Sequence, residues 1–235
     1  MNLELDDTKY TQRLMLNSKE YEPEITDCMK SILNKDSVFV DCGAHVGYFT
    51  VLGAELGAKV YAFEAERENY KQLTRNIKGN EYHNVKYYHK AVGDENKWQD
   101  LFVCLDNDGG NAFWDVGDHS FNKKSKETPT KQKVKMLTLD SVIEDEVTLL
   151  KIDVEGYEYK VLRGAERLLG LFHPTVIMEI NDFALSKVGD SKEVIFEFMK
   201  NLGYSCYDMQ TGDLWSATTV HKYVYNVVFI KLRLN

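Results

Sequence analysis

The feature of this chain that most constrains its fold is an alternation of short apolar runs and helix-patterned segments, punctuated by glycine. Residues 38–41 (VFVD) form an apolar run that stops at Gly43, and residues 48–56 follow helical spacing up to Gly57. Glycine suits a tight turn and a helix C-terminus because it tolerates positive φ. A strand followed by a turn and a helix indicates the start of a crossover between parallel strands.

The same two patterns recur along the chain. They predict further strands at 59–63, 85–92, 149–153, 176–180, 204–209 and 225–232, and helices that end at Gly79, cover 157–169 and cover 191–202. Strands that alternate with helices at this spacing predict an α/β fold with a mostly parallel sheet and helices on both faces. The last two strands are separated by only a loop, so we expect them to pair antiparallel.

The chain has the size and composition of one domain. Its 235 residues are 43% hydrophobic, with no internal repeat and no Pro-rich or Gly/Ser-rich linker. We therefore expect a single domain over residues 1–235, with an N-terminal helical segment at about 1–36. Residues 106–135 show no sustained period and predict a long surface loop, which we interpret as an acceptor-binding insert. The Lys-rich half, 123–135, is equally compatible with a plain solvated surface. Phe113, Trp114 and Phe121 favour a functional role for 109–122.

Charge and cysteine content limit the compartment and the partners. The net charge of −8 would repel a phosphate backbone, so we expect no nucleic-acid partner unless lysines cluster locally. The four cysteines form no C-x-x-C pair, and neither an export signal nor a long apolar segment is visible. We expect a cytoplasmic protein with reduced thiols and no membrane partner. Oligomeric state cannot be read from the sequence.

The segment Val40 to Gly47 predicts a nucleotide-type pocket. It places a glycine turn between the first strand and the first helix, where backbone must approach a ligand closely. Glu64 ends the second strand about 20 residues after Gly43, a position from which a carboxylate can accept both ribose hydroxyls. His45 stands where a dinucleotide fingerprint needs its second glycine. We therefore favour S-adenosylmethionine, which lacks phosphate and carries a sulfonium near Asp41 and Asp153, over a nicotinamide cofactor.

Six segments, taken in order, resemble the FkbM family of S-adenosylmethionine-dependent methyltransferases: VFVDCGAHVGYFT, YAFEAERENYKQLTRNI, YYHKAVGDE, LTLDSV, LLKIDVEGYEYKVLRGAERLL and PTVIMEIN. The resemblance covers roughly residues 21–230, and KIDVEGYE is its most specific part. It implies the Rossmann-like class I methyltransferase fold, with a seven-stranded sheet whose last strand is antiparallel. It also implies O-methylation of a sugar, polysaccharide or secondary metabolite. His45 and Ala65 depart from the asparagine and proline that are more usual in the family.

By matching positions, the resemblance assigns the donor site. Five residues of the glycine segment would cradle the methionine part, namely Asp41, Gly43, Ala44, His45 and Gly47. Glu64 would hold the ribose, Ala91 and Val92 would face the adenine, and Asp153 would lie beside the donor methyl.

Asp153 and Glu179 end neighbouring parallel strands, so both carboxylates should point into one cleft. They form our candidate catalytic pair, and His119 is a third candidate for the general base. Asp153 is equally compatible with donor binding or helix capping, and Glu155 is predicted to cap the following helix. Asp153, Glu179 and Asn181 are also candidate Mg²⁺ ligands. Two other functions remain open: a NAD-type oxidoreductase and a non-catalytic S-adenosylmethionine-binding module.

Overall fold

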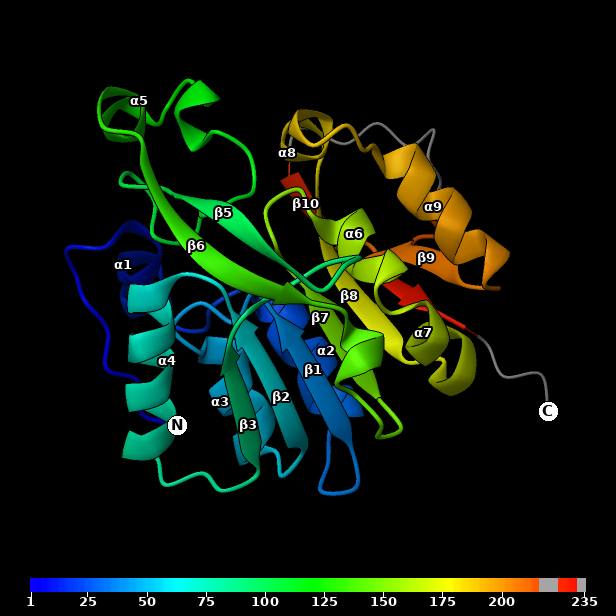
Figure 1. The fold of residues 1–235 in the computed structure, drawn as a ribbon. Coiled ribbons are helices and arrows are strands. Elements are labelled where there is room, and N and C mark those ends of the chain that lie inside the picture. Colours follow the sequence, from blue (N-terminus) through cyan, green and yellow to red (C-terminus); the bar gives the residue numbers. More distant parts are fainter. Residues whose placement is uncertain (216–223, 232–235) are drawn as a thin grey trace.

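A seven-stranded sheet forms the centre of the molecule (Figure 1). The computed structural model describes residues 1–215 and 224–231. Its strand order is β3-β2-β1-β7-β8-β10-β9. The strands are β1 (Val38–Cys42), β2 (Lys59–Glu64), β3 (Val85–His89), β7 (Leu149–Ile152), β8 (Thr175–Asn181), β9 (Ser205–Asp208) and β10 (Val224–Ile230). The order reverses between β1 and β7, which places a ligand crevice at their carboxyl ends.

The antiparallel closing strand is confirmed. β10 pairs antiparallel with β8 and with β9, whereas β1, β2, β3, β7 and β8 are joined by parallel ladders. Residue 232, which the sequence placed in the last strand, lies outside the described residues.

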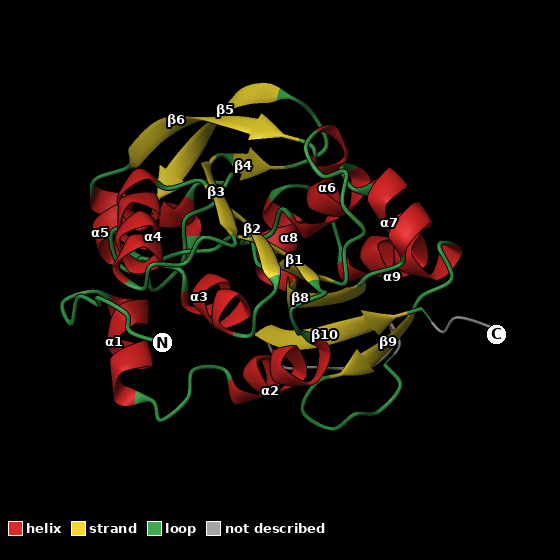
Figure 2. Ribbon diagram, turned by 90° about the horizontal axis from the view of Figure 1, so that it is seen from below, coloured by secondary structure: helices red, strands yellow, loops and turns green. Residues whose placement is uncertain are grey.

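Helices cover both faces of the sheet, as the sequence predicts (Figure 2). One face packs against α2 (Pro23–Ile32), α3 (Tyr48–Glu55) and α4 (Arg67–Gly79). The other packs against α6 (Glu158–Arg163), α7 (Glu166–Phe172) and α9 (Lys192–Asn201). Alternate residues of the strands serve the two cores: Phe39 and Leu149 face α2 and α3, and Val40 and Leu150 face the opposite layer. Two further helices are α1 (Tyr10–Asn17) and α8 (Asp182–Lys187), and Leu185 of α8 joins the core shared by α6, α7 and α9.

The third predicted strand is in fact two. After His89 the chain leaves the large sheet, and β4 (Ala91–Val92) pairs with β6 (Thr130–Leu137) in a second sheet of order β4-β6-β5. β5 comprises Lys97–Val103 and runs antiparallel to β6. β3 is mostly half-buried and β4 is buried, and no glycine or proline separates them, so the local sequence gives no sign of the break.

The segment 106–135 is not one long loop, contrary to our expectation. It contains a short 3₁₀ turn at Val116–Asp118, the helix α5 (Lys123–Glu127) and the first part of β6. The strand was missed because Lys131, Lys133 and Lys135 occupy its exposed face, while the buried face begins only at Val134. Lysine has a low strand propensity, so the alternation did not stand out.

The helix predicted over 157–169 is divided into α6 and α7 at Gly164. A Cβ on Gly164 would lie 1.9 Å from the carbonyl oxygen of Gly93. Only glycine allows this close approach, which brings the break between the two helices against the loop that follows β4. The apolar face runs across the break because both helices pack on the same core.

Candidate active site

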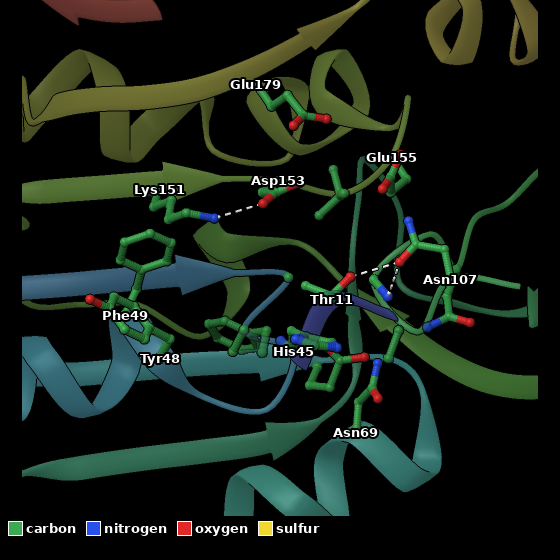
Figure 3. A pocket seen from close by; sticks show the side chains of 18 of the residues that line it. Thr11, His45, Tyr48, Phe49, Asn69, Asn107, Lys151, Asp153, Glu155 and Glu179 are labelled. Atoms are coloured by element: carbon green, nitrogen blue, oxygen red, sulfur yellow. Dashed lines mark hydrogen bonds and ion pairs between the residues drawn. The ribbon is translucent and has the colours of Figure 1, made fainter. Parts of the chain in front are cut away.

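A cavity of about 240 Å³ lies at the carboxyl ends of the central strands (Figure 3). Its walls come from the glycine loop after β1, the ends of β2, β7 and β8, the inner face of β5, and the N-terminal segment. The predicted residues that line it are Gly43, Ala44, His45, Glu64, Ala91, Val92, Asp153 and Glu179. This is the crevice that the strand reversal predicts.

The glycine loop brings backbone against the end of β7. Gly43 adopts φ +85°, and a Cβ there would lie 1.8 Å from the carbonyl oxygen of Asp153. Gly47, at φ +95°, begins α3 and packs against Leu73. Asp41 is buried beneath the loop, where Thr50 Oγ1 donates to its Oδ2 at 2.6 Å. Gly47 and Asp41 therefore shape the loop from outside the cavity wall.

Glu64 holds the glycine loop from the end of β2. Its two carboxylate oxygens accept from the backbone N–H of His45 at 2.8 Å and of Glu66 at 2.7 Å. Burial nevertheless raises the pKa of Glu64 to about 8, against the lowering effect of these two hydrogen bonds. Glu64 is thus a buried carboxyl in the cavity wall whose charge depends on pH near neutrality.

At the other end of the cavity, Lys151 forms an ion pair with Asp153. Lys151 Nζ lies 2.9 Å from Asp153 Oδ2, and only 3% of the lysine side chain is exposed. The ammonium also lies 4.9 Å from the centroid of the Phe49 ring. Glu179 lies beyond Asp153 in Figure 3, and burial, reinforced by the neighbouring Asp153 carboxylate, raises its pKa well above the ordinary value. We did not predict Lys151 as a site residue from the sequence, although it belongs to the KIDVEGYE motif.

Glu155 does not cap the next helix, contrary to our prediction. The N-cap residue of α6 is Tyr157, and the carboxylate of Glu158 accepts from the backbone N–H of Val154 and Gly156 in the preceding turn. Glu155 adopts a left-handed conformation at φ 52°, and its side chain lines the cavity. Burial raises the pKa of Glu155 to about 8. The cavity therefore holds a third carboxyl near Asp153 and Glu179.

An N-terminal clasp, made by α1, His45 and Asp108, closes one side of the cavity. Asp108 accepts from the backbone N–H of Thr11 at 2.7 Å and from Gln12 Nε2 at 3.1 Å, and its Oδ2 lies 2.9 Å from His45 Nε2. Although burial opposes it, the hydrogen bond and charge of His45 lower the pKa of Asp108 to about 2. No motif marked the clasp, because its three parts are far apart in the sequence.

Asp108→Asn should weaken the clasp by about 2 kcal/mol, because it removes the charge that accepts these hydrogen bonds. Amide hydrogen exchange over residues 10–17 should accelerate accordingly. Asp106→Asn is the matched control: Asp106 accepts from the backbone N–H of Lys124 and Ser125 and should affect α5 only. Unchanged exchange over 10–17 in Asp108→Asn would show that the clasp does not hold α1.

His119 lies outside the cavity. Its ring packs edge-on against Phe183, with 5.1 Å between the ring centroids. Of the three aromatic residues that suggested a functional insert, Phe113 lines the cavity and packs on Tyr157, and Trp114 is buried and donates to the Glu155 carbonyl. Phe121 is exposed.

The described residues do not support the Mg²⁺ site. Asn181 Oδ1 accepts from the backbone N–H of Ala184 and caps α8, and Asp153 is paired with Lys151. Within residues 1–215 and 224–231, no three His, Cys, Asp or Glu side chains are grouped as metal ligands. In the same residues, no helix is both long and apolar enough to cross a bilayer.

Comparisons with known proteins agree with this architecture. The model of the Methyltransferase FkbM domain matches residues 41–206. A methyltransferase FkbM from Methylobacillus flagellatus KT has a TM-score of 0.51 and 16% identity, over 97% of this chain and 48% of that one. This chain thus spans about half the length of that protein. SMU.1697c from Streptococcus mutans, in complex with SAH, has a TM-score of 0.54 and 12% identity, over 92% and 99% of the two chains. An rRNA methylase from Streptococcus thermophilus has a TM-score of 0.52 and 13% identity, over 89% and 95%. No curated protein matched the sequence.

The strand order of the large sheet, its antiparallel strand β10 and the crevice at the strand reversal define the class I S-adenosylmethionine-dependent methyltransferase fold. The chain belongs to the FkbM methyltransferase family, because the domain model matches well over half of its residues.

Proposed function

We propose that this methyltransferase transfers the methyl group to a hydroxyl of a sugar, polysaccharide or small secondary metabolite. The observation that carries the proposal is the cavity, which the glycine loop and Glu64 line together with Asp153, Glu155 and Glu179. S-adenosylmethionine supplies an electrophilic methyl on a sulfonium when it is bound. A hydroxyl acceptor must lose a proton, and a carboxylate in the cavity can accept it.

The loop fits a donor without phosphate better than a dinucleotide. The backbone N–H of His45, which a phosphate-binding loop would offer to its ligand, donates to Glu64. The His45 side chain occupies the space beside Asp108. These contacts support our assignment of Gly43, Ala44 and His45 to the methionine part and of Glu64 to the ribose.

We assign different roles to the two carboxyls of the catalytic pair. Asp153 is ion-paired with Lys151 and follows β7 at the glycine loop, so we propose that it faces the donor methyl. Burial raises the pKa of Glu179, so its ionised form is a stronger base than an ordinary exposed carboxylate. We therefore propose Glu179 as the proton acceptor. Most of the acceleration should come from alignment of the acceptor oxygen, the methyl carbon and sulfur.

Thermal unfolding with S-adenosylhomocysteine and with NAD tests the donor assignment. A ligand present at 100 times its dissociation constant adds about 2.7 kcal/mol to the free energy of unfolding. We expect this gain with S-adenosylhomocysteine and none with NAD. Consumption of S-adenosylmethionine across nucleotide sugars, glycans and polyketides then identifies the acceptor. Stabilisation by NAD alone would contradict the donor assignment, and donor binding without transfer to any acceptor would favour a non-catalytic module.

Affinity for S-adenosylhomocysteine should rise with pH. A ribose diol donates to a carboxylate, so binding favours the ionised form of Glu64, whose pKa is about 8 in the free protein. Below pH 8 binding must release a proton, and calorimetry should show the dissociation constant falling about tenfold from pH 6.5 to 8, then levelling. In Glu64→Gln affinity should fall about 30-fold at pH 8 and lose this pH dependence. The exposed Glu68→Gln serves as control, and a flat profile in the unchanged protein would contradict the role of Glu64.

The state of the cysteine thiols supports a proposal for the cellular compartment of the protein. The four cysteines form no disulfide. Free, mostly buried thiols are compatible with the reducing cytoplasm, which we propose as the location.

A further inference from the structure

The outer face of the small sheet carries a lysine ladder, which we define as Lys131, Lys133 and Lys135 on β6. All three side chains are exposed and alternate with residues that face inward. Residues two apart on a strand are separated by about 6.6 Å, so the ladder presents three positive charges over roughly 13 Å. The preceding helix α5 adds Lys123, Lys124 and Lys126.

The ladder contrasts with the charge of the rest of the chain. Residues 123–135 hold six lysines and one glutamate, whereas the other residues hold 23 basic and 36 acidic side chains. A local excess of one sign on an oppositely charged protein concentrates and orients ligands of the opposite charge. The charge of this face is therefore complementary to an anion.

Aromatic rings share the same face. The antiparallel register places Trp98 opposite Lys135 and Phe102 opposite Lys131. The Trp98 side chain is 67% exposed, and Lys131 Nζ lies 4.1 Å from the centroid of the Phe102 ring. An exposed indole provides a flat surface on which another ring can stack.

The sheet that carries the ladder also forms a wall of the cavity. Leu101 of β5 lines the cavity from the inner face, and Gln132 Nε2 donates to the carbonyl of Ala65, another lining residue. Figure 1 shows β5 and β6 lying across one end of the large sheet, with α5 beyond them. The ladder and the cavity therefore lie on opposite faces of one small sheet, and a long chain held on the ladder would have to pass around an edge of that sheet to present a hydroxyl in the cavity.

We propose that the lysine ladder and Trp98 bind an acceptor that is an anionic glycan chain, with sugar rings and widely spaced carboxylate or phosphate groups. This inference rests on the proposed transfer to a sugar hydroxyl. Asp100 lies opposite Lys133 on the same face, and the rest of the protein is strongly acidic. Both features disfavour a densely charged nucleic acid or a membrane surface, which need a broad positive area.

Binding of oligogalacturonate, measured without methyl donor, tests the proposal. Replacing Lys131, Lys133 and Lys135 by Gln should weaken binding about tenfold, because each exposed ion pair contributes a factor of roughly two to three. Trp98→Ala should also weaken it, and added salt should reduce binding to the unchanged protein. The matched control replaces Lys35, Lys78 and Lys200, which are exposed on other elements, by Gln and should bind normally.

Four outcomes would overturn the proposal: no binding of oligogalacturonate, equal binding of a neutral maltooligosaccharide, equal loss in both triple variants, or binding only of poly(U) or phosphatidylserine vesicles. Stabilisation by S-adenosylhomocysteine, measured on the same samples, shows whether each variant is folded and still binds donor. A failure of donor binding is thereby distinguished from a failure of the glycan surface.

Discussion

Lys151→Met should lower the free energy of unfolding by about 3–5 kcal/mol at pH 8 and abolish methyl transfer. Removing one partner of a buried ion pair leaves the other charge without compensation in a medium that solvates it poorly. The ammonium of Lys151 is bonded to Asp153 and also offsets the burial of Asp41, whose pKa burial raises. Methionine matches the length of the lysine side chain, so little packing is lost against Phe49.

The loss should depend on pH in a defined direction. Without Lys151, the pKa of Asp41 rises further, and a carboxyl with a raised pKa in the folded state stabilises that state most at low pH. Relative to the unchanged protein, the deficit at pH 5 should therefore be smaller than at pH 8. Denaturant unfolding at the two pH values measures it.

Lys59→Met provides the matched control. Lys59 also lies on a strand of the large sheet and pairs with Asp145 at 2.8 Å, but the two side chains are 42% and 33% exposed. Solvent screens this pair, so its loss should cost under about 1 kcal/mol. Equal small losses in the two variants would contradict the importance of the buried pair.

The sequence was sufficient for those parts of the fold that depend on periodicity and glycine. The strands around Val40 and Ile152 and the turn at Gly43 follow from local patterns that act in the same direction. The bend after His89, the break at Gly164 and the strand through Lys133 did not follow, because each is decided by a partner far away in the sequence. Gly164 illustrates this, since only the carbonyl of Gly93 explains why glycine is required there.

The candidate site, like the fold, could be predicted from the sequence only in part. Parallel strands end at one edge, so Glu64, Asp153 and Glu179 were expected in one crevice and all line the cavity. Lys151 and Asp108 were missed because a lone lysine in a strand and an aspartate in a polar segment carry no spacing signal. His119 was a candidate only because histidine titrates near neutrality, which says nothing about its position.

Glu179→Gln should lower kcat about 10²- to 10⁴-fold, the usual contribution of a positioned general base. The glutamine keeps the size of the side chain but cannot accept the proton. Because burial raises the pKa of Glu179, the rate of the unchanged enzyme should increase with pH as this carboxyl ionises. The variant should lose that increase and retain its affinity for S-adenosylhomocysteine.

Variants of two neighbouring carboxyls, Asp153 and Glu155, distinguish the role of Glu179 as base from a general effect of charge. Asp153→Asn should also lower kcat but keep an increase of rate with pH, displaced to lower pH, because the base stays in place while the neighbouring charge that raises its pKa is removed. Glu155→Gln removes a carboxyl from the same end of the cavity, and its effect should stay below about tenfold if Glu155 only contributes to the local field. A large loss in Glu155→Gln together with a mild one in Glu179→Gln would transfer the role of base to Glu155. The raised pKa of Glu155, about 8, makes that exchange chemically reasonable, so the pH profiles of the two variants decide between them.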